Sequence, residues 1–235
     1  NFVIGPGGKG SNQAVAAAKA GAKTYFISKI GNDQFGSMAT EIYKNSGVDY
    51  SNVIISKKYS TGAAGILVNE QTGANAINVF PGASGEITND DIDEAEETIK
   101  NSKIFLTQLE APKDVVLYAL KKANNFNVTT IFNPAPAIEI DETVFPLIDY
   151  FTPNETEASF YVDHKVETFE DAEKAAVQLI EKGIKNVVIT LGEKGAFFAN
   201  KEDKFSIPVA NLSNPVVDTT GAGDAFNAGF AAALT

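Results

Sequence analysis

The segment "DTTGAGDAF", residues 218–226, places a carboxylate, Asp224, directly after three residues with minimal side chains. Gly221, Ala222 and Gly223 leave the backbone open, and the apolar run that follows them favours a helix. The N–H groups at a helix start, together with the positive end of its dipole, bind anions. An Asp beside such an anion can accept the proton of an attacking hydroxyl, so the segment predicts phosphoryl transfer with Asp224 as the base. From these residues alone a tight turn, with Asp224 stabilising the first helical turn, is the alternative.

A second glycine-rich segment, "GPGGKGSNQAVAAAKAGA" at residues 5–22, also opens an expected helix. Lys9 is followed by Gly10 rather than by Ser or Thr, so the hydroxyl that binds Mg²⁺ in a P-loop is missing from its place. The open backbone presents Lys9 and Asn12, a combination of donors suited to sugar hydroxyls. The alternative is a structural turn ahead of an alanine-rich packing helix.

Composition limits the partners of the chain. The 235 residues carry a formal net charge of -11 and no basic cluster, which argues against nucleic acid as a partner. With zero cysteines there is no disulfide, thiolate nucleophile or Cys-ligated metal, and a reducing compartment is favoured. No apolar stretch has the length of a membrane span and no signal peptide is recognisable, so we expect a cytoplasmic protein with no membrane partner.

The ends of the chain interrupt expected elements. It begins without Met inside an apolar run and finishes within an apolar helical run, so we expect truncation at both ends.

Strands alternate with helices along the chain, which predicts an α/β fold built on one mostly parallel sheet. Two helices carry their own end signals, with Asp33 and Thr168 as N-caps and Gly47 and Gly183 as stops. We expect a single domain over residues 1–235. The apolar strand runs are residues 23–31, 103–110, 127–137, 148–157 and 186–192.

Residues 52–82 differ from the rest because short alternating strands meet there without an intervening helix. Gly73 suits a hairpin turn between them, and Phe2 to Ile4 supply a further short strand. Together these strands, about residues 1–4 and 52–82, predict a small β-sheet lid that can close on a ligand. The exposed edges of such a lid predict a homodimer that pairs through it.

In open α/β sheets, ligands bind beyond the carboxyl ends of the strands, which directs attention to the polar residues there. Asn154 and Glu157 lie one helical turn apart, so both can face one ligand. Mg²⁺ uses one or two carboxylates and keeps waters, so Glu157 can reach it through water. The alternatives are a first-turn helix acid for Glu157 and a solvated loop acid for Glu110. The residues expected at this edge are Glu110, Asn133, Asn154, Glu157, Gly192 and Asp224.

The segments "GGKGSNQAVAAAKAGA", "QLEAP", "NPAPA", "TPNETEA", "ITLGEKGAFF" and "DTTGAGDAFNAGF" occur in this order along the chain. As an ordered set they resemble the PfkB carbohydrate kinase family from end to end. The resemblance implies a ribokinase-like fold with a central sheet, flanking helices and a β-sheet lid. It also implies an ATP-dependent phosphotransferase with an alcohol acceptor, using Mg²⁺ and a monovalent cation such as K⁺.

The resemblance implies roles for individual positions. Asp224 is the base, Glu157 serves Mg²⁺ through water, and Asp218 and Thr220 help to hold the monovalent cation. The anion hole is Gly221, Ala222 and Gly223. The sugar-binding positions are Gly8, Lys9, Gly10, Ser11, Asn12 and Glu110, with Asp224. The nucleotide-binding positions are Asn154, Thr190, Leu191, Gly192, Glu193, Lys194, Gly195 and Gly223.

Three departures from the family pattern are visible. Ser11 replaces a commoner Ala, the family's first strand with its Asn-x-Asp pair is absent, and the remaining cation ligands lie beyond Thr235.

The expected reaction is phosphorylation of a pentose, D-ribose to ribose 5-phosphate. 2-Deoxyribose or a nucleoside is the alternative substrate within the same family. A catalytically silent sugar-binding regulator on the same scaffold is a different class of answer. A nicotinamide-dependent dehydrogenase is a third class, which would require a fingerprint loop after the first strand and an acid roughly 20 residues further on.

Overall fold

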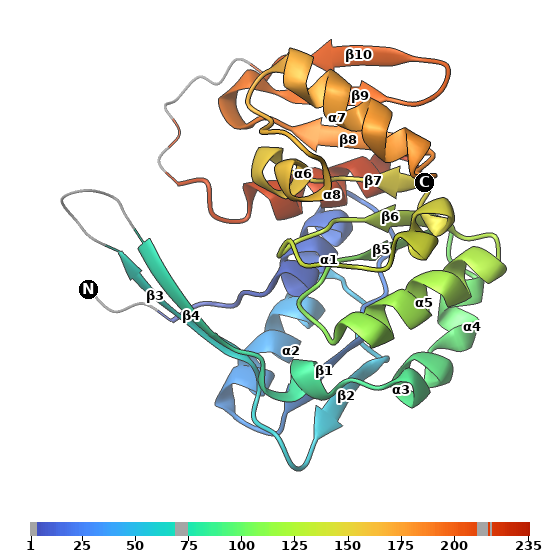
Figure 1. Ribbon diagram of the computed structural model, residues 1–235. Helices are drawn as coiled ribbons and strands as arrows, with labels where there is room; N and C mark the ends of the chain where they lie inside the picture. Colours follow the sequence, from blue (N-terminus) through green and yellow to red (C-terminus); the bar gives the residue numbers. More distant parts are fainter. Residues whose placement is uncertain (1–3, 69–74, 211–215, 217) are drawn as a thin grey trace.

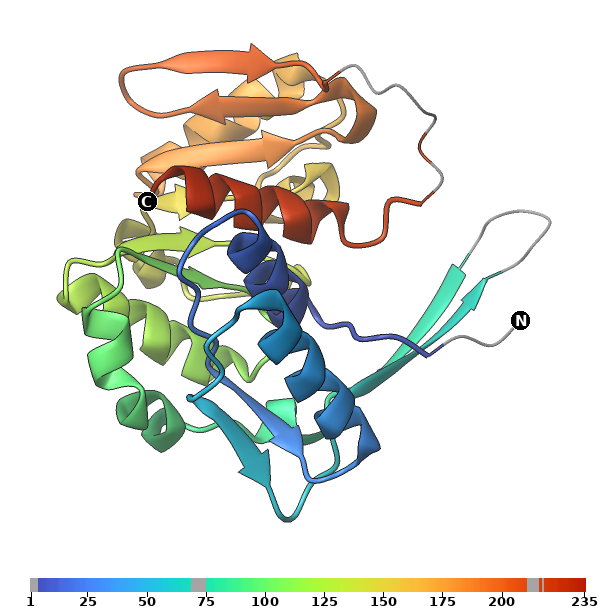
Figure 2. The same cartoon turned by 180° about the vertical axis from the view of Figure 1, so that it is seen from behind.

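A central sheet lies between two layers of helices in the computed structural model, which describes residues 4–68, 75–210, 216 and 218–235 (Figures 1 and 2). Within these residues the sheet has six strands in the order β10-β9-β8-β7-β6-β5. Strands β5 to β8 are parallel, and β9 and β10 continue the sheet in antiparallel fashion. The mostly parallel sheet predicted from the sequence is confirmed. The strands are β5 (Ile104–Thr107), β6 (Thr129–Phe132), β7 (Tyr150–Phe151), β8 (Asn186–Thr190), β9 (Ala196–Ala199) and β10 (Lys204–Ile207).

Helices cover both faces of this sheet. Figure 1 shows α5 (Lys113–Asn125), α6 (Glu155–Tyr161) and α7 (Phe169–Glu181) in front of it. Figure 2 shows α1 (Lys9–Lys19), α2 (Gln34–Ser46) and α8 (Ala222–Ala233) on the opposite side. The short elements are α3 (Asn89–Glu94), α4 (Glu96–Lys100) and the 3-10 turns η1 (Gly82–Glu86), η2 (Glu142–Leu147) and η3 (Gly192–Lys194). No helix of the described part is both long enough and apolar enough to cross a membrane.

The largest apolar core lies between the sheet and helices α5 to α7. Phe132 and Phe151 stack at a centroid distance of 5.9 Å on neighbouring strands, and both are fully buried. Helix α7 presents Ala172, Ala175 and Leu179 to this core, a spacing that gives one apolar stripe along a helix. Burial of a large apolar side chain contributes about 1.5–3 kcal/mol, so these contacts fix the sheet against its helices.

Both predicted helix caps are present. The Asp33 carboxylate accepts the Gly36 amide at 2.8 Å, and α2 ends at Gly47 in the left-handed conformation with φ 77°. Thr168 forms a capping box at the start of α7, and Gly183 follows its end with φ 111°. These ends are set by local residues, as cap and stop preferences require.

The first expected strand and the start of the expected lid are arranged differently from the prediction. Strand β1 (Ser28–Gly31) does not join the central sheet but pairs in parallel with β2 (Val53–Ser56). Helix α2 connects them, so they form a βαβ unit rather than part of an antiparallel lid. Val53 packs with α1 and α2 residues in a separate small core, which holds β2 away from the lid.

The lid is therefore a single hairpin, β3 (Ala63–Val68) and β4 (Asn75–Phe80), which pairs antiparallel and projects away from the body of the protein (Figure 1). The predicted turn residue Gly73 and residues 1–3 lie outside the described residues, and Ile4 is not in a strand. Ile66, Leu67 and Phe80 are all exposed on the hairpin. The central body and its lid have the arrangement that the sequence predicts, with a smaller lid.

Candidate active site

The two glycine-rich helix starts meet at Asp224. Gly221 precedes α8 with φ 77°, and Asp224, the third residue of the helix, is only 8% exposed. Its Oδ2 accepts the side-chain amide of Asn12 at 2.8 Å, and its Oδ1 accepts that of Gln13 at 3.1 Å. Both donors come from the first half of α1, which lies beside α8 (Figure 2). The carboxylate is thus buried, oriented and close to the start of a helix dipole.

The backbone beside Asp224 can receive an anion. Among the described residues, the amides of Gly221 and Gly223 have no hydrogen-bond acceptor. The Ala222 amide instead donates to the Thr219 carbonyl at 3.0 Å. Of the three positions expected in the anion hole, two therefore present unengaged N–H groups, and the Ala222 amide closes a turn.

The expected sugar positions divide into two groups. The Lys9 amide donates to Glu110 Oε2 at 2.7 Å, so the loop after β5 is joined to the start of α1. Gly8 carries φ 91° and lies beside the same carboxylate, since an added Cβ would sit 3.8 Å from Glu110 Oε2. Gly8 and Lys9 thus lie against Glu110 at the start of α1, and Asn12, one turn further along the helix, bonds Asp224.

Gly10 and Ser11 make packing contacts instead. A Cβ added at Gly10 would lie 3.2 Å from the Phe26 ring, so glycine permits a close approach there. Ser11 lies beside Tyr43 of α2: burial raises the pKa of Tyr43, and the nearby Ser11 side chain opposes this rise. The side chain of Ser11 therefore faces α2 rather than Asp224.

Asn154 and Glu157 form a capping box at the start of α6. Asn154 Oδ1 accepts the Glu157 amide at 2.8 Å, and Glu157 Oε2 accepts the Asn154 amide at 2.9 Å. Burial raises the pKa of Glu157, while the Asn154 amide and the charge of Lys9 lower it and the charges of Glu155 and Asp224 raise it. The charges of Lys9 and Asp224 both affect the pKa of Glu157, so the start of α6 is electrostatically coupled to the starts of α1 and α8.

The loop after β8 lies next to this cap. The Thr190 amide donates to the Pro153 carbonyl at 3.0 Å, and a Cβ added at Gly192 would lie 3.8 Å from Glu155 Oε1. Thr190 and Gly192 are thus at the carboxyl edge of the sheet, where Gly192 was predicted. Glu193, in the middle of η3, is exposed.

Three other positions of this loop have structural partners. Leu191 is 4% exposed and belongs to the large core. The Lys194 ammonium donates to the Glu167 carbonyl at 2.6 Å. A Cβ added at Gly195 would lie 2.0 Å from the Ile207 carbonyl oxygen, so glycine is required for the approach of β10. Leu191 and Gly195 thus serve packing and Lys194 binds a backbone carbonyl, which the motif did not reveal.

The expected cation positions are exposed. Asp218 Oδ1 accepts the Thr220 amide at 2.8 Å, and this hydrogen bond lowers the pKa of Asp218. No group of three or more His, Cys, Asp or Glu side chains in the described part of the chain could hold a metal ion. The half-buried carboxylate of Glu157 fits Mg²⁺ that arrives on phosphate oxygens, since Mg²⁺ needs only one or two protein carboxylates.

A chain of mostly buried polar residues beneath Asp224 was missed by sequence reasoning, except for Asn133. Its members come from α1, α8 and the carboxyl ends of β5, β6 and β7. Each member is hydrogen-bonded to the next, and the link from Asn133 goes to the backbone carbonyl of Thr152. A polar residue on the buried face of an alanine-rich helix was the available signal for Gln13. The members are the half-buried Gln108 and the buried Gln13, Asn133, Thr152 and Asn227.

Comparison with known proteins agrees with this geometry. The family model described as "pfkB family carbohydrate kinase" matches residues 1–235. A bifunctional ribokinase/ribose-5-phosphate isomerase A from Fructilactobacillus sanfranciscensis is 41% identical over 97% of this chain, which spans 42% of that relative's length. A deoxyribokinase from Salmonella typhi is 36% identical over 98% of this chain and 74% of its own length.

Solved structures show the same fold. A ribokinase from Thermotoga maritima superimposes with a TM-score of 0.88 at 40% identity, covering 100% of this chain and 75% of its own. An Arabidopsis thaliana ribokinase complexed with ribose and ATP gives a TM-score of 0.88 at 32% identity, covering 97% of this chain and 74% of its own. The fold is ribokinase-like, as the sequence predicts.

This chain belongs to the PfkB family of carbohydrate kinases. The prediction of an ATP-dependent sugar kinase, a phosphotransferase with an alcohol acceptor, is confirmed.

The spacing G-x-G-x-x-G of a dinucleotide-binding loop is present at Gly5, Gly7 and Gly10, but the described residues before α1, residues 4–8, form no strand. Without a strand before the loop, this segment lacks the context of a dinucleotide fingerprint.

Proposed function

We propose that this site transfers the γ-phosphoryl group of ATP to the primary hydroxyl of D-ribose, giving ribose 5-phosphate and ADP. The observation that carries the proposal is the Asp224 carboxylate, buried at a helix start and held by two side-chain amides beside the amides of Gly221 and Gly223. Phosphoryl transfer requires positioning and charge stabilisation above all, and this arrangement offers both.

In the proposed reaction Asp224 accepts the proton of the primary hydroxyl as its oxygen attacks the γ-phosphorus. The bond between that phosphorus and the oxygen bridging to ADP breaks, and ADP leaves with the electron pair. The amides of Gly221 and Gly223 stabilise the charge on the transferring group. Asn12, the Lys9 region and Glu110 hold the sugar hydroxyls, so that the attacking oxygen lies next to Asp224.

Asn154 and Glu157 are proposed to lie beside the nucleotide phosphates, with Thr190 and Gly192 at their edge. Mg²⁺ bound to those phosphates would neutralise their charge and orient them, and Glu157 would meet it through water. A monovalent cation such as K⁺ is proposed at Asp218 and Thr220. Because ATP is the co-substrate and the chain has no cysteine, we place the enzyme in the cytoplasm.

We also propose that the β3–β4 hairpin closes on the sugar and joins two copies of the chain. A two-stranded hairpin is only marginally stable alone in water, so it gains from a partner surface. Ala64 pairs with Val79 and Ala63 with Phe80, and successive pairs point to opposite faces of the hairpin. Val79 is 63% exposed and Phe80 61% exposed, so each face offers an apolar side chain to cover. Light scattering after size exclusion would test the dimer.

The experiment that tests the proposal is mass-spectrometric detection of product from ATP, Mg²⁺ and one of three acceptors: ribose, 2-deoxyribose or adenosine. The parent chain and its Asp224→Asn variant are compared. Ribose phosphate formed by the parent and absent with the variant supports the proposal. Faster turnover of 2-deoxyribose would assign the alternative that the deoxyribokinase relative favours. Sugar binding without any product would identify a silent binding protein.

A further inference from the structure

Gln13 occupies an unusual position for a polar side chain. It is 1% exposed, on the face of α1 that packs against α8 and the carboxyl ends of β5 and β6. Its Nε2 donates to Asp224 Oδ1 at 3.1 Å and to Asn133 Oδ1 at 3.2 Å, and its Oε1 accepts the amide of Gln108. Burial of an amide costs free energy unless it is hydrogen-bonded, and every polar atom of Gln13 has a partner.

The direction of the Gln13 amide is fixed by its neighbours. Asn133 donates its Nδ2 to the Thr152 carbonyl at 3.0 Å, which turns Asn133 Oδ1 toward Gln13. A flipped Gln13 would bring its carbonyl oxygen against two acceptors, Asn133 Oδ1 and Asp224 Oδ1, and its NH₂ against the NH₂ of Gln108. Buried unmatched groups of this kind cost about 1–3 kcal/mol each. One orientation is therefore strongly preferred, with the Gln13 donor aimed at Asp224.

Gln13 and Asn12 donate to different oxygens of Asp224, and the two donors differ in burial. Asn12 is half-buried and bonds Oδ2, whereas Gln13 is fully buried and bonds Oδ1. Oδ2 is therefore the oxygen on the open side, and Oδ1 is the oxygen on the protein side. A carboxylate bonded only at Oδ2 could rotate about its Cβ–Cγ bond, and the contact with Gln13 opposes that rotation.

We infer that Gln13 is a positioning residue, which locks the rotation of the Asp224 carboxylate so that Oδ2 meets the hydroxyl of the acceptor sugar. The inference rests on the proposed function, since the value of a fixed Oδ2 is proton transfer from that hydroxyl. Gln13 itself does not reach the sugar, because its amide is enclosed by Asp224, Asn133 and Gln108. Its loss should therefore lower kcat rather than weaken sugar binding.

Two substitutions that preserve the volume of the side chain test this. Gln13→Met removes the donor and the acceptor, and Gln13→Glu keeps the shape and the acceptor for Gln108 but sets a second carboxyl group against Asp224 in place of the amide donor. Displacement of a catalytic group by about 1 Å can cost about 10²-fold, so kcat of both variants is expected to fall by about that factor, with KM for ribose within about threefold. Full kcat in Gln13→Met would overturn the inference, because the donor would then be unnecessary.

The control is Thr130→Val, which removes another fully buried polar group, at the opposite edge of the sheet. It is expected to lower Tm while leaving kcat within about twofold. If Thr130→Val lowered kcat as much as Gln13→Met at the same loss of Tm, a purely structural role for Gln13 would be established and the inference overturned.

Crystal structures separate failure of this inference from failure of the proposed function. If the parent chain phosphorylates no sugar, the proposed function fails, but the orientation of Asp224 can still be compared between the parent and Gln13→Met. A carboxylate rotated away from Asn12 in the variant supports the locking role. A carboxylate still bonded to Asn12 with unchanged torsion angles overturns it.

Discussion

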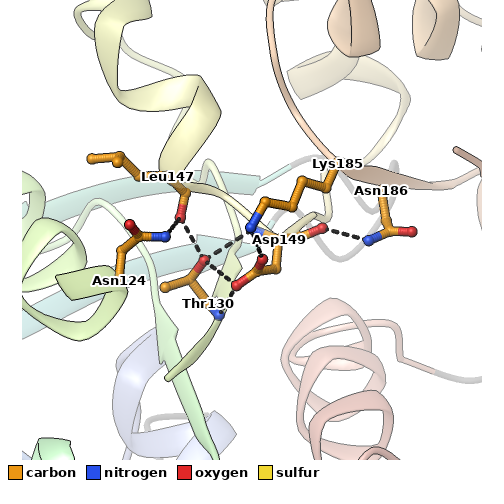
Figure 3. A network of polar contacts seen from close by, with 6 residues as sticks. All are labelled: Asn124, Thr130, Leu147, Asp149, Lys185 and Asn186. Atoms are coloured by element: carbon orange, nitrogen blue, oxygen red, sulfur yellow. Dashed lines mark hydrogen bonds and ion pairs between the residues drawn. The ribbon is translucent and has the colours of Figure 1, made fainter. Parts of the chain in front are cut away.

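The two edges of the central sheet each hold a partly or fully buried carboxylate, and the two are held in different ways. At the amino edge, Asp149 binds Lys185 at 2.6 Å through Oδ1 and accepts the Thr130 amide at 2.8 Å through Oδ2 (Figure 3). Its own backbone amide donates to the Thr130 hydroxyl, and its carbonyl accepts the Asn186 side chain. The starts of β6, β7 and β8 are tied together by this one residue.

At the carboxyl edge Asp224 has only neutral partners among the described residues, the amides of Asn12 and Gln13. Asp149, in contrast, has both a cation and a backbone amide. A carboxylate bonded to an ammonium group and to backbone is committed to holding strands together. A carboxylate oriented by neutral donors beside open backbone amides keeps an oxygen for a ligand. The difference teaches that the partners of a buried acid, more than its burial, distinguish a structural group from a reactive one.

The largest expected effect is the loss of turnover in Asp224→Asn. The amide accepts no proton from the hydroxyl, and loss of a general base costs typically 10²–10⁴-fold, so kcat should fall by about 10³-fold. The free energy of unfolding should also fall, by about 1–3 kcal/mol, because Asn can accept only one of the two side-chain amides and sets its own NH₂ against the other. Steady-state kinetics and urea melts of both proteins measure this. A kcat within tenfold of the parent would show that Asp224 is not the base, and the carboxylates at the two edges would then not differ in reactivity.

The matched substitution at the other edge is Asp149→Ala. It leaves the buried Thr130 amide without its acceptor, so the free energy of unfolding should fall by about 2–3 kcal/mol. The ion pair adds little to this figure, since Lys185 is more than half exposed. Activity per folded molecule should stay within twofold of the parent. Stability is read from urea melts, and a strong loss of kcat at low temperature would contradict the assignment.

Asp33 sharpens the comparison because it follows a parallel strand, β1, yet has partners like those of Asp149. Its carboxylate accepts the Gly36 amide at 2.8 Å and the Thr61 amide and hydroxyl at 2.7 Å each. It joins the start of α2 to Thr61, two residues before the lid hairpin. Asp33→Asn keeps the cap but sets its NH₂ against the Thr61 amide, and should cost about 1–2 kcal/mol.

The acid dependence of stability provides a second measurement on Asp33. The amides of Gly36 and Thr61 lower the pKa of Asp33 below its ordinary 3.8. A lowered pKa gives stability that is present above pH 3.8 and is lost as pH falls through the folded value. The parent should therefore lose its advantage over Asp33→Asn in strong acid. If the difference in stability between the parent and Asp33→Asn stayed constant from pH 7 down to pH 2, the charge of Asp33 would not contribute to its contacts with Gly36 and Thr61.

The smallest expected effect is a gain in stability in Glu157→Gln. Burial raises the pKa of Glu157 above 4.5, so its stabilisation is present below pH 4.5 and is lost as pH rises through the folded value. The uncharged variant escapes this loss and should melt about 1–2 °C higher than the parent at pH 7, with the difference vanishing near pH 4. Calorimetry at the two pH values measures this difference in Tm. A variant that melts below the parent at pH 7 would show that the charge of Glu157 does not destabilise the folded protein.

Much of the local structure was predictable from the sequence. Asp33 and Thr168 cap the helices they were expected to cap, and the apolar runs before Gln108, Asn133 and Asn154 form strands of the parallel sheet. Caps and periodicity act over a few residues, so the sequence shows them directly. The assignment of β2 to the lid was wrong because pairing joins segments across a helix, which no local pattern records.

In the candidate site, too, local features were predictable from the sequence and long-range contacts were not. The sequence by itself determined that two glycine-rich segments open helices, that an acid sits in the first turn of one of them, and that polar residues follow the strands. Only the tertiary structure decided that Asn12 and Gln13, over 200 residues before Asp224, hold its two oxygens, and that Leu191 turns into the core. The physical reason is that residue patterns specify which face of an element is buried, whereas packing alone decides which faces meet.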